Sequence, residues 1–433
     1  MDKKKFLLNF ILPIVLMSTF GAFFWAIRGT GGYGGSMGGV FAGLGWASCW
    51  YYLSRGKASS PFASGWIFAA CILGFAVGGS HGYGQFLQWI NGVFNLTSSI
   101  TVPVDPFHGF AWLAWCGLTW GGTAGIFIAW TSTYQKASMK EWIFRAIFGI
   151  GGIFAGIGIF LAFPGIALPL YDLGYYANFT TCPSCARTVS TALGAMALNG
   201  FFIGLLVNEA LHRRKAGILL AGIIGAGFAI AFVGGTGWFL AGTWFPGQTA
   251  WKSWEMTIGF GGGTSIGVAH WLVHRAAKPV EPARMAGMAQ ASRKESFFGK
   301  SLPIAVAMMV VVYNGLNSEG FYDNFFLGDL TMMVVLLAIS VIAALAILAL
   351  TIVFFTVGKN VWKQARASGN PSTWPLLEFL LIQGFLAGIG FLVSSYADMT
   401  APAWYLIISY MILLGIGWGF VIGVYFVQQA KKK

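Results

Sequence analysis

Long apolar stretches recur along the whole chain and are separated by short polar breaks. About 20 apolar residues in an α-helix cross the roughly 30 Å hydrocarbon core of a bilayer. The pattern therefore predicts an all-α polytopic membrane protein with about 12 transmembrane helices, grouped into six hairpins. The expected helices cover residues 6–27, 36–54, 63–79, 109–131, 143–163, 187–210, 216–239, 255–273, 301–316, 329–357, 375–394 and 402–427.

The composition agrees with this pattern. Of the 433 residues, 57% are hydrophobic and 9% are charged, whereas a soluble domain carries about 25% charged residues. No stretch between the apolar ranges is large enough for a separate soluble domain, so we expect a single transmembrane domain over residues 1–433. The first apolar range is too long for a secretory signal and lacks a small-residue cleavage site, so we expect it to remain as a helix.

Basic residues indicate the orientation, because Lys and Arg in short loops are retained on the cytoplasmic side. With the N-terminus inside, 23 of the 26 basic residues fall on the inner side, and the exceptions are Arg28, Arg187 and Lys252. We expect a protein integral to a bacterial inner membrane, with both termini in the cytoplasm. The net charge of +13 then reflects topology and contact with membrane lipids, and we expect no nucleic-acid partner.

Several predicted hairpins resemble one another. A Gly-Phe pair recurs at positions 74, 227 and 384, which suggests three parallel four-helix repeats over residues 1–140, 141–295 and 296–433. Internal duplication is common in transporters. The alternative is that glycine-rich membrane helices resemble one another by composition alone.

The chain contains 61 glycines, and each glycine inside a helix costs about 1 kcal/mol relative to alanine. Close packing of membrane helices through small residues explains most of them. Glycine runs also cluster at the expected outer ends of the first, third and seventh helices, beside Ser or Thr and an aromatic residue. We expect the backbone to open there and to line a polar, outward-facing cavity.

A candidate substrate site follows from these helix ends. Arg28 ends an apolar helix on the side where basic residues are rare, and a glycine run follows it at once. A guanidinium beside open backbone amides suits a carboxylate, sulfate or phosphate. The alternatives are that Arg28 reaches the lipid headgroups or pairs with Asp105 or Glu255. The predicted substrate-binding residues are Arg28, Gly31, Gly32, Tyr33, Ser80, His81, Tyr83, Thr236, Trp238 and Glu255.

Other candidate chemistry is sparse. Cys182 and Cys185 form a C-x-x-C on the expected outer side, where a redox pair or a zinc half-site is also conceivable, and we expect a structural disulfide. Glu255 has a simpler role as a helix-start acid paired with Lys252. We expect no metal and no cofactor, because His81, Asp105 and His108 lack a compact ligand spacing. Aromatic residues beside the glycine turns could form stacking walls for a sugar or aromatic ring, namely Trp25, Tyr33, Tyr83, Trp120 and Trp238.

Together these features favour a membrane transporter or permease for a small polar solute, anionic or sugar-like. No catalytic residue is assigned. The alternative is a membrane-embedded enzyme acting on a lipid-linked or periplasmic substrate, with His81, Asp105, His108 or Glu255 as acid or base. A third possibility is a structural or anchoring subunit, which the scarcity of charge would suit.

The predicted topology can be tested with reporter fusions. Reporters placed after residues 57, 138, 214, 290 and 364 should all report the cytoplasm, because each position follows a predicted inner helix end. Activity of a periplasmic reporter and of a cytoplasmic reporter at each position gives the readout. A periplasmic location of the reporter at two or more of these positions would contradict the twelve-span arrangement.

Overall fold

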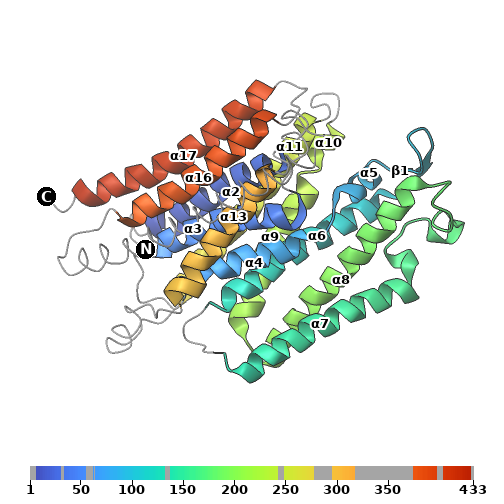
Figure 1. The fold of residues 1–433 in the computed structure, drawn as a ribbon, viewed down its shortest axis with the longest axis horizontal. Coiled ribbons are helices and arrows are strands. Elements are labelled where there is room, and N and C mark those ends of the chain that lie inside the picture. Colours follow the sequence, from blue (N-terminus) through green and yellow to red (C-terminus); the bar gives the residue numbers. More distant parts are fainter. Residues whose placement is uncertain are drawn as a thin grey trace, which may run out of the picture.

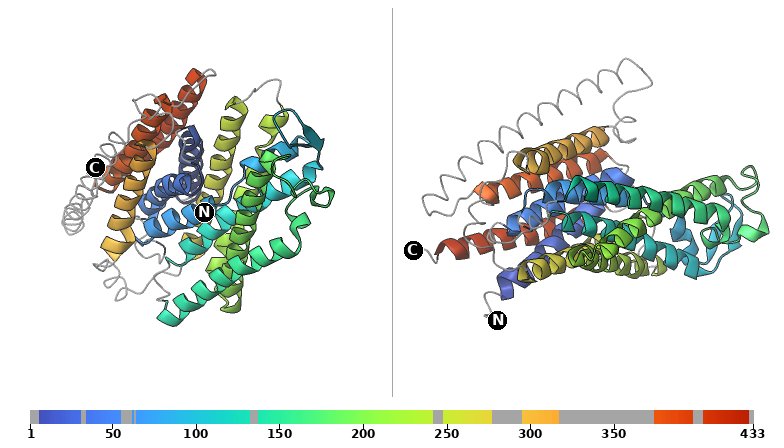
Figure 2. Two further views of the ribbon diagram at one scale, coloured as in Figure 1. Left: turned by 45° about the vertical axis from the view of Figure 1, so that its right-hand side comes forward. Right: turned by 90° about the horizontal axis from the view of Figure 1, so that it is seen from below.

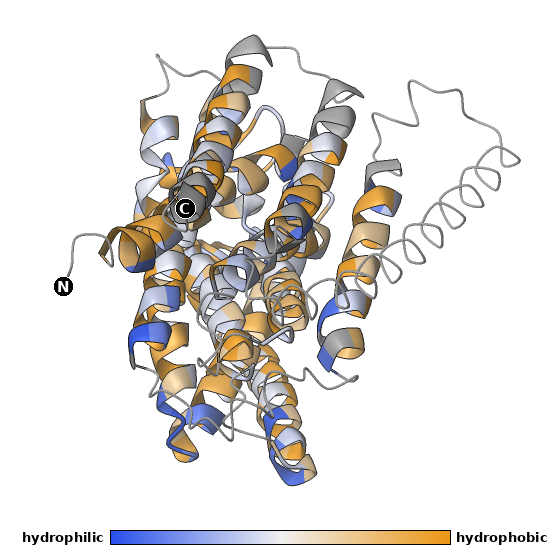
Figure 3. Cartoon of the chain, turned by 90° about the vertical axis from the view of Figure 1, so that its left-hand side faces the viewer, coloured by the Kyte–Doolittle hydropathy of each residue, from blue (hydrophilic) through white to orange (hydrophobic). Residues whose placement is uncertain are grey.

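The computed structural model describes residues 6–30, 34–54, 62, 64–131, 137–241, 248–276, 295–316, 374–396 and 403–430. These residues are mostly helical and form a bundle of long, closely packed helices (Figure 1). In Figure 3 apolar colours dominate the helix bodies, and much of the hydrophilic colour lies near helix ends. The helical fold class is therefore confirmed.

The described helices and strands follow one another along the chain in this order: α2 (Leu12–Thr30), α3 (Gly35–Ser54), α4 (Ile67–Gly79), α5 (Leu87–Ile90), β1 (Val93–Asn95), β2 (Thr101–Pro103), α6 (Pro106–Ala129), α7 (Met139–Ala162), α8 (Pro183–Leu211), α9 (Lys215–Gly234), α10 (Gly237–Leu240), α11 (Gln248–Ala276), α13 (Leu302–Leu316), α16 (Trp374–Tyr396) and α17 (Ala403–Ala430). The π-helical turns Leu7–Ile11 and Glu295–Ser301 precede α2 and α13. Short 3-10 turns occupy Gly84–Phe86, Pro164–Ile166 and Tyr171–Leu173.

Helices occupy eleven of the predicted ranges, and the range 329–357 lies outside the described residues. Six of the described helical segments are long and apolar enough to cross a membrane: Leu7–Gly29, Pro106–Ala129, Met139–Ala162, Pro183–Leu211, Lys215–Leu240 and Phe297–Asn314. Three shorter apolar helical segments cover Ile67–Gly79, Glu378–Gly390 and Ile408–Gly423. These helices are compatible with a membrane-integral protein, and the count of twelve spans and the threefold repeat remain predictions.

Local sequence signals set several helix starts. The carboxylate of Asp105 accepts a hydrogen bond from the backbone N–H of Phe107 at 2.9 Å, and Pro106 takes the first position of α6. Ser138 and Glu141 form a reciprocal capping box at the start of α7. These caps satisfy backbone N–H groups that have no partner within the helix.

Glycines allow pairs of neighbouring helices to come into backbone contact. In α6, Gly117, Gly121 and Gly125 lie one turn apart and contact the backbone of α9. An added Cβ on Gly152 of α7 would overlap the carbonyl oxygen of Gly200 in α8, and the reverse also holds. Gly39 and Gly43 make the same kind of contact between α3 and α4, and Gly21, Gly259 and Gly263 make it between α2 and α11. Close packing therefore accounts for most of the glycines in the described helices.

The paired helices occupy different sides of the bundle. The α7–α8 pair lies on one side, and α16 and α17 lie on the other side, beyond α2 and α3 (Figures 1 and 2). Thr119 of α6 donates a hydrogen bond to Asn199 of α8 at 2.6 Å, which links the α7–α8 pair to the rest of the bundle. The largest apolar cluster runs through the centre and contains fully buried side chains from α2, α3, α6, α9 and α11.

A small cap covers one end of α6 and α8. It consists of residues 84–105, with the antiparallel β1–β2 hairpin, and residues 163–182. Its apolar side chains, including Trp89 and Phe94, form a cluster separate from the main core. Cys182 and Cys185 are joined by a disulfide in this cluster, with their Cα atoms 5.3 Å apart.

The glycine contacts can be tested by a matched pair of alanine substitutions in α7. Gly152→Ala should lower the Tm, because the added methyl meets backbone in α8 and overpacking costs about 1–3 kcal/mol. Gly151→Ala is the control, since a Cβ there has nothing within 4 Å. Thermal unfolding of the two purified variants gives the comparison, and equal Tm values would contradict the glycine contact.

Candidate functional site

Arg28 lies in the last turn of α2, and its side chain is fully buried. Its guanidinium carbon is 4.1 Å from the ring centroid of Trp25 and 5.5 Å from that of Trp120. Nη2 of Arg28 donates a hydrogen bond to the hydroxyl of Tyr83 at 3.5 Å. Burial among these rings argues against the alternative in which Arg28 extends to the lipid headgroups.

Tyr83 reaches Arg28 from the segment that follows α4. Its ring packs against Trp254 and Phe232, with centroids 5.3 and 5.5 Å away. Its hydroxyl accepts the hydrogen bond from Arg28.

Glu255 contributes the acidic group of this site. Its Oε2 accepts a hydrogen bond from Nζ of Lys252 at 2.7 Å, and both side chains are buried. The carboxylate also lies directly against Gly29, where an added Cβ would overlap it. Gly29 thus lets the start of α11 approach the end of α2. The predicted pairing of Glu255 with Lys252 is present, but the prediction that Glu255 starts the helix is wrong, because α11 begins seven residues earlier, at Gln248.

The remaining predicted residues lie elsewhere or outside the description. Gly31, Gly32 and Tyr33 fall outside the described residues. Ser80 is exposed and its hydroxyl is 2.6 Å from that of Ser36. The hydroxyl of Thr236 donates to the carbonyl of Val233 at 2.6 Å, and Nε1 of Trp238 donates to Thr257 at 2.9 Å.

The turn that carries Thr236 and Trp238 nevertheless borders the site. An added Cβ on Gly235, beside Thr236, would lie 2.7 Å from the ring of Trp254. Trp254 in turn contacts Tyr83. Thr236 and Trp238 therefore lie on the far side of the Trp254 ring from Tyr83.

His81 faces the cap. It is fully buried, its ring centroid is 6.1 Å from that of Trp112, and its Nδ1 is 3.1 Å from the carbonyl oxygen of Gly82. Burial lowers the pKa of His81 to about 4, and the hydrogen bond to Gly82 opposes this only in part. The imidazole is neutral at physiological pH, so His81 is a poor proton carrier there.

The depth of Arg28 can be measured along α6. Trp120 lies 14 residues after Pro106 and nine before Ala129 in the 24-residue helix, which places it roughly 21 Å from one end and 14 Å from the other at 1.5 Å per residue. Arg28 therefore lies at an intermediate level of α6. The sequence predicted a site in the outer half of the bundle, whereas Trp120 lies nearer the Ala129 end of α6, which is the cytoplasmic end in the predicted topology.

Two tryptophans beside Arg28 have an unusual environment. Trp25 and Trp120 are fully buried, and their ring centroids are 4.5 Å apart. Neither indole N–H has a hydrogen-bond partner within the described ranges. A buried unpaired donor costs about 1–3 kcal/mol. Because these rings are enclosed, they do not form the exposed stacking walls considered from the sequence.

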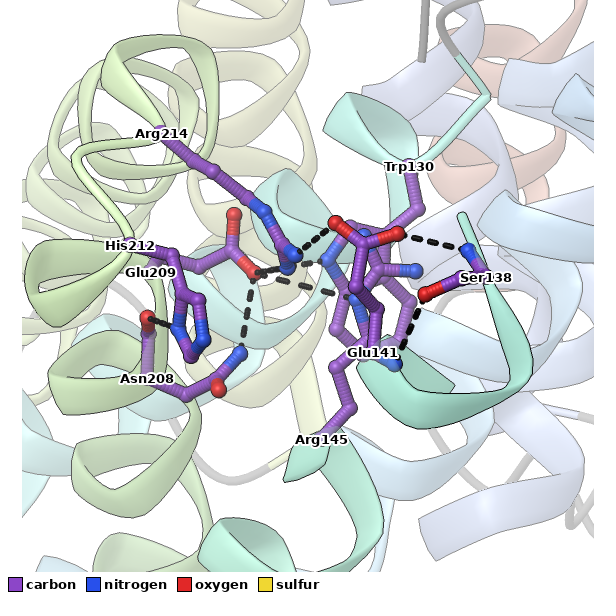
Figure 4. Close-up of polar contacts among 8 residues, drawn as sticks. All are labelled: Trp130, Ser138, Glu141, Arg145, Asn208, Glu209, His212 and Arg214. Carbon is purple, nitrogen blue, oxygen red and sulfur yellow. Dashed lines mark hydrogen bonds and ion pairs between the residues drawn. The ribbon is translucent and has the colours of Figure 1, made fainter. Parts of the chain in front are cut away.

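A second polar cluster, drawn in Figure 4, lies where α6, α7, α8 and α9 end or begin. Glu209 is buried and accepts hydrogen bonds from Nε1 of Trp130 at 3.0 Å and Nη1 of Arg214 at 3.3 Å. Arg214 also pairs with Glu141 at 2.5 Å. Arg145 stacks between Trp130 and Trp142, with its guanidinium carbon 4.4 Å from both ring centroids. Its Nε lies 3.9 Å from Glu209.

The sequence predicted only part of this cluster. Arg213 is the arginine nearest to Glu209 in the sequence, but Arg213 is exposed and has a left-handed φ of 52°. This turn directs the next residue, Arg214, back to Glu209. Arg145 is 64 positions from Glu209, so no local spacing could reveal their proximity; an arginine inside an apolar range was the available signal.

Two further polar contacts went unrecognised. The hydroxyl of Ser54 lies 3.2 Å from Nε2 of His270 and 2.9 Å from Nε2 of His274. Glu378 pairs with Lys300, 78 positions earlier in the chain, at 2.5 Å. Among the described residues no group of three or more His, Cys, Asp or Glu side chains could hold a metal ion.

Glu209 should be important for stability. Glu209→Gln leaves Arg145 and Arg214 facing a neutral amide, and breaking a buried ion pair in this way costs about 3–5 kcal/mol. Glu141→Gln is the matched control, because Glu141 is 36% exposed and Arg214 retains Glu209. Thermal unfolding should show a much larger loss for the first variant. Equal decreases in Tm for the two variants would contradict a special role of Glu209 in stability.

Comparison with known proteins finds no matching family model, no similar curated protein and no similar solved structure. The residues themselves are therefore the basis for inferring function. Of the two charged clusters, the Arg28 cluster combines a buried guanidinium with unpaired donors at an intermediate depth. The Glu209 cluster balances two arginines against two glutamates.

Proposed function

We propose that this chain is a secondary transporter or permease of a bacterial inner membrane, with cytoplasmic termini, that carries a small polar solute. The observation that carries the proposal is the fully buried guanidinium of Arg28, enclosed by two indoles and hydrogen-bonded to Tyr83. In this proposal Arg28 is the main solute contact, with Tyr83 and Glu255 beside it.

A buried arginine calls for a functional explanation. Charged side chains within membrane helices are costly, and they commonly mark substrate or ion pathways. The two cation–π contacts of Arg28 compensate for part of the lost hydration, at about 2 kcal/mol or more for a desolvated contact. A solute that carries a carboxylate or another anionic group would suit this site, because the guanidinium matches such groups geometrically.

The position of the cluster also suits a transporter. Transporter sites lie near the bilayer midplane, at helices that end or break there. Near Arg28, α2 ends at Thr30 and α4 ends at Gly79, and Gly78 packs against the backbone of Trp120. An outward-facing cavity beside these helix ends would admit the solute.

Between the two solute classes considered, the geometry favours an anion. A sugar site usually presents an exposed aromatic face, and the rings around Arg28 are buried against one another. The enzyme alternative has less support, because Asp105 is exposed and serves as a helix cap while His81 is buried under the cap. Nothing in the described contacts brings these two together with Glu255.

Uptake by proteoliposomes tests the proposal. Arg28→Lys keeps the charge but loses the planar fork, so uptake of the transported anion should fall at least about tenfold. Radiolabelled acetate, lactate, phosphate and sulfate form the test panel. Arg187→Lys is the matched control, because Arg187 is exposed in the first turn of α8. If both variants insert and fold, and uptake by the Arg28 variant equals wild type, Arg28 does not contact the solute.

A further inference from the structure

The indole N–H groups of Trp25 and Trp120 differ from those of other tryptophans in the described residues. Six indoles donate to acceptors at 2.9–3.1 Å, and these belong to Trp46, Trp50, Trp112, Trp130, Trp238 and Trp254. Trp25 and Trp120 donate to none within the same ranges. Buried polar groups in proteins are normally satisfied, so each exception needs a ligand, an ion or a water to explain it.

The two unpaired donors share one location with a cation. The ring centroids of Trp25 and Trp120 lie 4.5 Å apart, and the guanidinium carbon of Arg28 is 4.1 and 5.5 Å from them. All three side chains are fully buried. Trp89 and Trp418 also have unpaired N–H groups, but among the described residues no Lys or Arg side chain lies over either ring.

Two polar groups near these donors take part in other hydrogen bonds. Oε2 of Glu255 accepts from Lys252 at 2.7 Å, and the hydroxyl of Tyr83 accepts from Arg28. The indole N–H groups of Trp25 and Trp120 are two buried donors without an acceptor within the described residues. A water or a sugar hydroxyl that accepted these hydrogen bonds would still need acceptors for its own protons, whereas an anion accepts without donating.

We propose that the indole N–H groups of Trp25 and Trp120, together with Arg28, bind a small monovalent anion such as a halide, nitrate or a short carboxylate. This inference rests on the proposed function, because it identifies the bound ion with the transported solute. The full burial of all three side chains requires an anion that sheds most of its water. Since the dehydration penalty grows with the square of the charge, a monovalent anion fits better than sulfate or a phosphate dianion.

Thermal unfolding of the purified full-length protein in detergent tests binding without requiring transport. The probes are sodium bromide, nitrate and acetate, compared with sodium sulfate at equal ionic strength and with sucrose. A ligand that binds only the folded state raises the Tm with concentration, and the curve gives an apparent Kd. The monovalent anions should raise the Tm and saturate, while sulfate and sucrose should give no saturable effect.

Isosteric tryptophan analogues locate the site. Benzothienylalanine replaces the indole N–H by sulfur and keeps the ring shape. Introduced at Trp25 or Trp120, it should raise the apparent Kd at least about tenfold, because hydrogen bonds to charged groups are strong. The same analogue at Trp89 is the matched control, since Trp89 is also buried and unpaired but belongs to the cap. There the Kd should be unchanged.

The outcomes separate this inference from the proposed function. Saturable binding that is lost at Trp25 and Trp120 and kept at Trp89 supports the site, even if proteoliposomes show no uptake. No saturable effect of any monovalent anion on the wild type overturns it, even if uptake depends on Arg28. Equal weakening by the analogue at all three positions also overturns it. If the Trp25 or Trp120 variant does not fold, the wild-type protein still provides a test. A saturable rise in Tm with bromide, and none with sulfate or sucrose, supports the proposal, and no saturable rise with bromide overturns it.

Discussion

Backbone contact between helices, made possible by glycine, is the constraint on which the rest of this structure depends. Lipid removes the hydrophobic drive for helices to associate, so close packing must replace it. In α2 and α11 the Cα of Gly259 approaches the carbonyl oxygen of Gly21, and Gly263 approaches that of Met17. The same contact further along, at Gly29, admits the carboxylate of Glu255. Larger side chains at these positions would separate the two helices and the groups that they bring together.

The buried charges follow from this close packing. Arg28 is enclosed because α2 and α6 lie near enough for Trp25 and Trp120 to touch. Glu209 is enclosed because α7 and α8 pack through Gly152 and Gly200, which brings Arg145 within 3.9 Å of it. The two clusters differ in how their charged and polar groups are paired. Around Glu209 two arginines face two glutamates, whereas the indoles beside Arg28 offer donors that nothing in the described chain accepts.

Features with a local origin could be predicted from the sequence. Helices occupy the predicted apolar ranges within the described residues, because hydrophobic length is a local property. The pairing of Glu255 with Lys252, three positions away, is likewise a local helix contact. The residues of the candidate site were only partly predictable. Arg28 was recognisable as an arginine at an outer helix end, but its enclosure by Trp120 depends on a contact across 92 positions.

The limits of sequence reasoning have a physical cause. Ser80, His81 and Thr236 share the glycine-rich surroundings of the other site residues, yet the turns that carry them face different neighbours. A shift of one residue along an α-helix changes the direction of the side chain by about 100°. Amino-acid composition does not determine which side of a helix faces which neighbour. The orientation of Arg214 toward Glu209 depends on the left-handed backbone of Arg213, a residue type that seldom adopts it.

The most direct test of this account is an experimental density map of the full-length protein in lipid nanodiscs. The account predicts that α2 and α11 are in backbone contact at Gly21 and Gly259, with the side chain of Arg28 enclosed between Trp25 and Trp120. A map in which these two helices are separated at the glycines, and in which Arg28 extends to the lipid headgroups, would contradict it.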